Sequence, residues 1–185
     1  MKTQGCIRSN EDMSLYTKKC PGERSIMLIL YIHHMLIVGK NKDELSLLKK
    51  NLSQTFDMKD LGDAKHILCR CITRDRSKRC IYLSQAEYIS KVLKRFNMEN
   101  AKSLSTPLPT YVKLSMCDCP TSDEDKEFMT KVPYQSAIGS LMYAMVATRW
   151  NATFAVGAVS QFMSNSGKKH WDAVKLILRE VFMFG

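Results

Sequence analysis

Two apolar runs rich in β-branched residues stand close together in the first quarter of the chain. They are Ile26–Ile32 and Met35–Val38, and the polar break between them is His33–His34. Short apolar runs on either side of a polar break are typical of a buried β-hairpin with polar residues at its tip. We therefore predict a hairpin over residues 25–39. A solvated tip needs no function, so spacing alone leaves the two histidines open between ordinary surface residues and a site.

Two later segments carry apolar residues at helical spacing, over residues 41–56 and 84–96. Each begins with a residue that caps helices, Asn41 or Ser84, and a glutamate follows three positions later, as in a capping box. The apolar faces consist of Leu45, Leu48, Leu52 and Phe56 in the first helix and of Ile89, Val92, Leu93 and Phe96 in the second.

Between these helices the pattern favours strands over residues 66–73 and 80–83, on either side of a turn that reads RDRSKR. We expect one small antiparallel sheet from residues 25–83 with the 84–96 helix beside it. After this point the pattern changes. Residues 101–121 contain several Pro, Ser and Thr residues and are predicted to be a linker and the domain boundary.

The remainder of the chain, residues 122–185, is predicted to be all-helical. A short helix over 122–131 begins with three acidic residues, which the helix dipole favours. Apolar helices follow over 134–148 and 153–163, and a last helix over 168–184 has Trp171, Val174, Ile177, Leu178 and Val181 on one face. The fold class expected from the whole pattern is α+β.

The net charge of the chain indicates a candidate binding partner. The chain has 28 Lys and Arg residues against 18 Asp and Glu residues, a net charge of +10, which suits a polyanion such as nucleic acid. A basic protein without a specific partner is the alternative. No apolar run is long enough to cross a membrane or to form a signal peptide, so we expect no membrane contact, no secretion and a cytoplasmic or nuclear location.

The seven cysteines are expected to be reduced thiols. Two pairs have one residue between the cysteines, Cys69/Cys71 and Cys117/Cys119, whereas zinc sites generally have two and need four ligands. We therefore predict no metal site at these pairs. Nor do the adjacent His33 and His34 have a convincing third ligand.

Several longer motifs resemble the reverse transcriptase of copia-type (Pseudoviridae) retrotransposons, in that family's order and spacing. They are LILYIHHMLIVGKNKDEL, QTFDMKDLGDAKHIL, IYLSQAEYISKVLKRFNM, STPLPT, PYQSAIGSLMYAMVATR and KKHWDAVKLILR. The resemblance covers nearly the whole chain, to about Arg179. It implies a partial palm and thumb over residues 1–100, the proline-containing linker over 101–121, and a helical connection over 122–185 that leads toward a ribonuclease H domain not present in this chain.

The resemblance also brings out departures from the family. The hairpin tip of the family reads tyrosine, any residue, aspartate, aspartate, methionine, whereas this chain has His33 and His34 at the aspartate positions. Its arginine–proline–aspartate corresponds to Arg149, Trp150 and Asn151, and the ending EVFMFG replaces its tyrosine–leucine–lysine–glycine. The family's first palm aspartate and its fingers region are expected to lie upstream of Met1, outside this chain.

Polymerisation by the resembled family uses two Mg²⁺ ions held by palm aspartates. Magnesium prefers carboxylate oxygens, whereas imidazole is a neutral nitrogen donor. We therefore expect no intact catalytic residue, no bound cofactor and no small-molecule substrate: a truncated, inactive fragment of a copia-type Pol polyprotein. A non-catalytic nucleic-acid-binding module and a remnant without function are the alternatives.

The same resemblance implies weak, sequence-independent contact with template–primer duplex. The turn at 74–79 lies in the hairpin that corresponds to a primer grip, and the 84–96 helix corresponds to the thumb helix. Basic side chains in these elements can contact phosphates, although they are equally ordinary on a solvated surface. The candidate nucleic-acid-binding residues are Arg74, Arg76, Lys78, Arg79, Lys91, Lys94 and Arg95.

Overall fold

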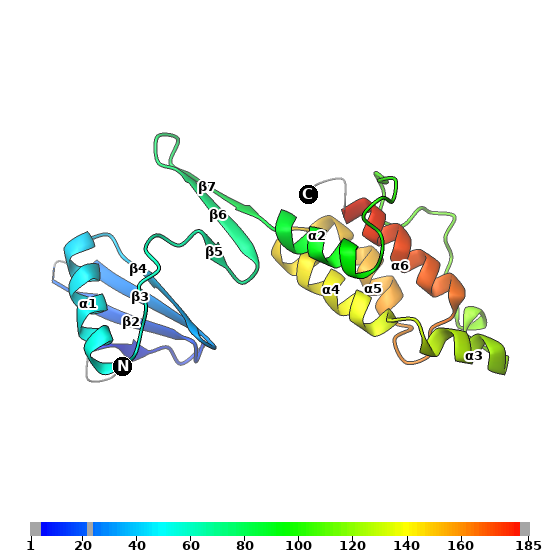
Figure 1. Cartoon of the computed structure of the whole chain (residues 1–185), viewed down its shortest axis with the longest axis horizontal. Helices are drawn as coiled ribbons and strands as arrows, with labels where there is room; N and C mark the ends of the chain where they lie inside the picture. The colour runs from blue at the N-terminus through cyan, green and yellow to red at the C-terminus, as the bar shows by residue number, and fades with distance from the viewer. Residues whose placement is uncertain (1–4, 22–23, 182–185) are drawn as a thin grey trace. The chain divides into compact units, whose positions relative to one another are not determined.

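The computed structural model describes residues 5–21 and 24–181, and the chain divides into two compact units, Met1–Ala64 and Lys65–Gly185. Within the described residues there are six α-helices and two antiparallel sheets (Figure 1). The mixed α and β content agrees with the predicted α+β class. The single sheet predicted from residues 25–83 is wrong, because the strands of the two units do not pair with one another.

The first unit is a four-stranded sheet with one helix packed on it. The strands lie in the order β1 (Ile7–Arg8), β2 (Leu15–Cys20), β3 (Arg24–Tyr31) and β4 (His34–Val38), and α1 (Lys42–Thr55) follows. Alternate strand residues point to opposite faces. On the face toward α1 the buried core consists of Cys6, Ile26, Leu28, Leu48 and Leu52.

The predicted hairpin over 25–39 is confirmed as β3 and β4, with Leu28 paired to Ile37 and Tyr31 to His34. The predicted helix over 41–56 is confirmed as α1, and the side chain of Asn41 accepts a hydrogen bond from the backbone N–H of Asp43. Strands β1 and β2 were not predicted. Phe56 ends the helix and is exposed, so it does not share the buried face of Leu48 and Leu52.

The second unit begins with a small sheet of β5 (His66–Ile67), β6 (Arg70–Asp75) and β7 (Cys80–Ser84). Strand β7 leads into α2 (Ala86–Arg95). The remaining elements are η2 (Met116–Asp118), α3 (Asp123–Thr130), α4 (Tyr134–Ala147), η3 (Trp150–Ala152), α5 (Thr153–Ser160) and α6 (Lys168–Val181). These bounds confirm the predicted helices, although the residues after Val181 and the side chain of Val181 lie outside the described part of the chain.

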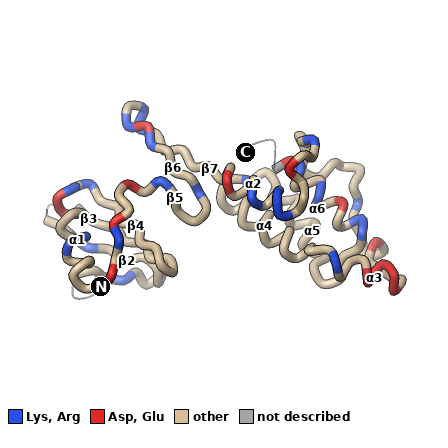
Figure 2. Tube along the Cα trace, viewed as in Figure 1, with Lys and Arg blue, Asp and Glu red and all other residues tan. Residues whose placement is uncertain are grey.

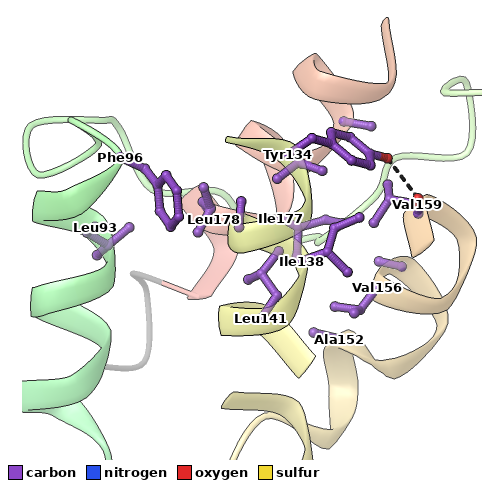
Figure 3. Close-up of a cluster of buried hydrophobic side chains, with 14 of the residues drawn as sticks. Leu93, Phe96, Tyr134, Ile138, Leu141, Ala152, Val156, Val159, Ile177 and Leu178 are labelled. Carbon is purple, nitrogen blue, oxygen red and sulfur yellow. Dashed lines mark hydrogen bonds between the residues drawn. The ribbon is translucent and has the colours of Figure 1, made fainter. Parts of the chain in front are cut away.

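One hydrophobic core joins α2, α4, α5 and α6 (Figure 3). Leu93 and Phe96 of the α2 segment pack in the same cluster as Ile138 of α4 and Leu178 of α6. The hydroxyl group of Tyr134 donates a 2.7 Å hydrogen bond to the carbonyl oxygen of Val159, shown as a dashed line in Figure 3. Because α2 shares this core, it belongs with the helices that follow the proline-rich segment.

Residues 101–121, which we call the strap, are packed against this helical core. The backbone N–H of Leu104 donates to the carbonyl oxygen of Arg179 at 3.3 Å, and Nε of Arg179 donates to the carbonyl oxygen of Lys102 at 2.7 Å. Apolar side chains of the strap lie against the core: Leu108, Val112 and Leu114. The division between the compact units therefore lies near residue 64 and not in the strap, because apolar contacts cross the predicted boundary and tie 84–96 to 134–181.

Candidate nucleic-acid interface

The tip of the β3–β4 hairpin is a turn formed by Ile32 and His33. Tyr31 and His34 are the last paired residues on either side, so His34 is the first residue of β4. The tip therefore lies one residue earlier than the predicted His33–His34 break. Ile32 has a positive φ of 50°, which matches the left-handed backbone that tight hairpin turns require. Both imidazoles are exposed.

The hairpin presents two exposed imidazoles, at the positions where the resemblance predicts two carboxylates. A neutral imidazole offers a nitrogen atom and no negative charge, and it repels a metal ion when it is protonated. Among residues 5–21 and 24–181, no group of three or more His, Cys, Asp or Glu side chains is placed to hold a metal ion. The chemistry of this tip does not favour Mg²⁺.

The basic turn between β6 and β7 is ordered by Asp75. Its Oδ1 atom accepts a 2.6 Å hydrogen bond from the hydroxyl of Ser77 and a 3.0 Å bond from the backbone N–H of Lys78. These bonds, that from the Ser77 hydroxyl first, hold the pKa of Asp75 below its usual value. Nζ of Lys78 lies 3.8 Å from Asp75. The turn therefore holds its exposed cations on a fixed backbone.

The basic residues of α2 lie on the side of the helix that faces away from the core. Lys91, Lys94 and Arg95 are exposed, whereas Ile89 and Leu93 are buried. The predicted apolar and basic faces of this helix are therefore both present. The guanidinium of Arg95 lies 5.7 Å from the centroid of the Phe96 ring.

The structure does not bring these two basic sets into one site (Figure 2). Strand β7 runs from the basic turn to the start of α2. A five-residue strand spans about 17 Å and a ten-residue helix about 15 Å, so the sets are spread along the chain. Any polyanion that contacts both sets must be extended.

One polar contact that the sequence did not reveal joins the start of α2 to the end of α4. Gln85, at the start of α2, is buried, and its Oε1 accepts a 2.7 Å hydrogen bond from the hydroxyl of Thr148 at the end of α4. The predicted cap, Ser84, instead accepts from the backbone N–H of Ala86 at 3.2 Å. Because Gln85 pairs with a residue 63 positions away, no local pattern marks its role.

The segment Arg149, Trp150 and Asn151, where the sequence departs from the family's pattern, lies beside a buried carboxylate. Glu180 is fully buried, and its Oε1 accepts a 2.6 Å hydrogen bond from Nδ2 of Asn151. Burial raises the pKa of Glu180, and the Asn151 hydrogen bond and the charge of Arg149 oppose that rise. Burial also lowers the pKa of Arg149. Trp150, between Arg149 and Asn151, is exposed.

A comparison with models of protein families identifies the family to which this chain belongs. The family model described as reverse transcriptase (RNA-dependent DNA polymerase) matches residues 1–110. The match covers more than half of the chain, and the chain therefore belongs to the reverse transcriptase family.

Comparison with individual proteins places the similarity, within this family, among the copia-type transposons. The chain is 53% identical over 97% of its length to the Retrovirus-related Pol polyprotein from transposon TNT 1-94 of Nicotiana tabacum, but covers only 14% of that protein. It is 33% identical over 96% of its length to the corresponding polyprotein from transposon RE1 of Arabidopsis thaliana, of which it covers 11%. The resemblance drawn from the motifs is confirmed.

A shorter relative also matches. An uncharacterized mitochondrial protein of Arabidopsis thaliana is 32% identical over 83% of this chain, which covers 60% of that protein. No solved structure matches the chain. No helix among the described residues is long and apolar enough to cross a membrane.

Proposed function

We propose that this chain is a non-catalytic fragment of a copia-type reverse transcriptase that binds template–primer duplex weakly and without sequence preference. The observation that carries the proposal is the exposed tip of the β3–β4 hairpin, where His33 and His34 stand in place of the family's aspartates. In this proposal β3 and β4 correspond to the palm hairpin and α2 to the thumb helix.

Loss of catalysis follows from the chemistry of metal-assisted phosphoryl transfer. Two divalent cations must be placed so that one activates the primer hydroxyl and the other stabilises the leaving pyrophosphate. Two imidazoles supply neither the oxygen ligands nor about two negative charges that the aspartates give. Because a metal site tolerates displacements of only about 0.5 Å, this loss alone is expected to abolish polymerisation.

Duplex binding rests on cations that the fold leaves exposed to phosphates, although Lys78 also lies 3.8 Å from Asp75. Arg76, Lys78 and Arg79 lie on the turn ordered by Asp75, and Lys91, Lys94 and Arg95 lie on the exposed side of α2. Contacts to phosphate position a protein on a duplex and carry no sequence information. Their spacing along β7 and α2 suits an extended backbone and not a compact anion.

Catalysis is tested by primer extension on an RNA template with Mg²⁺ or Mn²⁺. We expect no extension by the wild type, and extension by the wild type would overturn the proposed inactivity. The double variant His33→Asp, His34→Asp restores both carboxylates. His66→Asp is the matched control, because it adds a carboxylate at another exposed histidine of a strand. Extension by the double variant alone would show that the histidines carry the whole defect.

Binding is tested by titrating labelled duplex at several salt concentrations. The logarithm of affinity should fall linearly with the logarithm of salt, and each lost phosphate contact should reduce the slope by about 0.9. The triple variant Arg76→Gln, Lys78→Gln, Arg79→Gln is therefore expected to reduce the slope by about 2–3. Affinity that is absent or independent of salt would contradict the proposal.

A matched control removes three positive charges from ion pairs elsewhere on the surface. Lys126 pairs with Asp123, Lys131 with Glu127 and Lys175 with Asp172. The triple change of these lysines to glutamine alters the net charge equally. An equal loss of slope in this control would show that net charge, and not the β6–β7 turn, governs binding.

A further inference from the structure

His170 is the buried member of the chain's four histidines. Its side chain is 0% exposed, whereas His33, His34 and His66 are exposed. The imidazole stacks on the ring of Phe162, with 4.0 Å between centroids and 14° between planes. A buried imidazole must have its nitrogen atoms paired, because an unpaired polar atom away from water costs free energy.

Both ring nitrogens of His170 have backbone partners. Nδ1 accepts a 2.9 Å hydrogen bond from the backbone N–H of Gly167, and Nε2 lies 3.2 Å from the carbonyl oxygen of Ser115. Since Nδ1 accepts, the hydrogen atom of the neutral ring is on Nε2, where it is donated to Ser115. The contacts select one tautomer of the neutral imidazole.

The position of His170 in α6 explains the first bond. Gly167 immediately precedes the helix, and His170 is its third residue. In a capping box a Glu or Gln at this position accepts from the backbone N–H of the capping residue. Here Nδ1 of His170 accepts the bond from the N–H of Gly167, and Nε2, on the other side of the ring, contacts Ser115 of the strap.

The strap is fitted closely to this point. Ser115 caps η2 through a reciprocal capping box with Asp118. A Cβ atom on Gly167 would overlap the carbonyl oxygen of Asp118, so the two backbones approach as closely as glycine allows. Nζ of Lys169 lies 3.0 Å from Oδ1 of Asp118 and joins the same two segments.

The charges around His170 disfavour a second proton on the ring. Asp118 on η2 is the neighbouring carboxylate, but Lys169 pairs with it, and Lys168 pairs with Asp125 of α3 at 2.7 Å. Phe162 contributes no charge. Burial lowers the pKa of His170, although the hydrogen bond to Ser115 and the charge of Asp118 oppose that change, and the charge of Lys169 and the positive end of the α6 dipole act in the same direction as burial.

We propose that His170 is an acid-sensitive latch whose protonation releases the strap from the start of α6. A hydrogen atom on Nδ1 would face the N–H of Gly167 and break the cap, whereas protonation does not itself oppose the bond from Nε2–H to Ser115. To separate the two N–H groups, either the ring turns and Nε2 leaves Ser115, or Gly167 moves away from the ring and from Asp118 of the strap. Release would uncover the apolar side chains that the strap places against the helical core: Leu108, Val112 and Leu114.

The sign of the pH dependence follows from linkage. Because the pKa of His170 is lowered in the closed state, the latch is fully stable above about pH 6.5 and loses stability as the pH falls through the lower, closed-state value. Between about pH 6.5 and that lower value, the one proton taken up on release raises the opening constant about tenfold per pH unit, and below the lower value the constant levels off.

The test is hydrogen exchange of the full chain from pH 7.5 to pH 5.0, corrected for intrinsic exchange. In the wild type, amide protection of residues 101–121 should fall by up to tenfold per pH unit below about pH 6.5, while that of α4 does not. His170→Gln keeps an acceptor at the capping-box position without titrating, so its strap protection should not depend on pH. His66→Gln, at an exposed histidine, should behave as the wild type.

A second measurement needs no variant. The ¹⁵N shifts of His170 should report the Nε2–H tautomer at neutral pH, and strap protection should level off at the pH of their titration midpoint. Strap protection that is constant with pH in the wild type would overturn the proposal. So would an equal loss in His170→Gln, or strap protection that continues to fall well below the titration midpoint of the imidazole.

Discussion

The hydroxyl group of Tyr143 donates a 2.7 Å hydrogen bond to the carbonyl oxygen of Leu68, which lies 75 positions earlier in the chain. The bond joins α4 to the tight turn between β5 and β6. Leu68 and Cys69 in that turn have positive φ values of 49° and 55°. The ring of Tyr88 lies 5.1 Å from that of Tyr143, so an aromatic pair supports the contact. The small sheet is thus attached to the helices at its turn.

Replacing Tyr143 by phenylalanine should weaken this attachment with little change in packing. We expect the free energy of unfolding to fall by about 1 kcal/mol, the usual net value of one hydrogen bond. Urea unfolding of Tyr143→Phe measures the loss, and Tyr82→Phe, at an exposed tyrosine of β7, is the control. Equal stability of the two variants would contradict the role of the Tyr143–Leu68 bond.

Adding a methyl group at Gly167 should destabilise the second unit. The new Cβ would overlap the carbonyl oxygen of Asp118, and the backbone on either side must move. We expect Gly167→Ala to cost about 2–3 kcal/mol. Gly157 lies within α5 and has open space around its Cβ position, so Gly157→Ala should stabilise by about 0.5–1 kcal/mol. Thermal unfolding compares the two, and a similar cost at both positions would be inconsistent with this packing.

Tyr134→Phe should lower stability at neutral pH by about 1–2 kcal/mol, because the buried carbonyl oxygen of Val159 loses its hydroxyl donor. Burial raises the pKa of Tyr134 to about 12. A raised pKa in the folded state means that the wild type keeps this stabilisation below about pH 10 and loses it toward pH 12. The difference between variant and wild type should therefore shrink from pH 9 to pH 11.5 in urea titrations. A constant difference would contradict the assignment.

Asn151→Ala removes the Nδ2–H donor to Glu180 and should cost about 1.5–3 kcal/mol at pH 7, as expected for a hydrogen bond to a buried charge. The pKa of Glu180 is raised, so its contribution to stability is largest below the unfolded value and is lost as the pH rises through the folded value. The protonated Glu180 side chain carries no charge, so its burial depends less on the hydrogen bond from Asn151. The cost should therefore be smaller at pH 4.5 than at pH 7, and Asn100→Ala, at an exposed asparagine, should show neither effect.

Helix positions were the most predictable part of the fold. The segment 41–56 carries both a period of about 3.6 residues and a capping signal, and α1 lies within one residue of it at each end. The apolar segment 134–148 likewise matches α4 to within one residue. Strand pairing was less predictable. A period of two identifies a strand but not its partner, so one sheet was predicted where there are two. Strand β2 was missed because Lys18 and Lys19 interrupt its apolar pattern.

The sequence also did not show which elements pack against a buried helix face. The face of Ile89 and Leu93 was predicted, but its contacts with α4 and α6 arise from residues far along the chain. The prolines in 101–121 correctly predicted a lack of regular structure. A segment without regular structure can still pack against a core, and the strap does so. The basic residues of the candidate interface are exposed as expected, but their separation depends on the length of β7 and α2.

The shared core of α2 and α6 has a consequence for synthesis on the ribosome. Some 70 residues separate the end of α2 from the start of α6, which is about 4–15 s of elongation at 5–20 residues per second. During that interval the nascent chain carries the apolar face of Ile89, Leu93 and Phe96 without Leu178, its neighbour in the finished core. Chaperones that bind exposed apolar segments have this window in which to act on the chain, and the window closes when α6 leaves the exit tunnel.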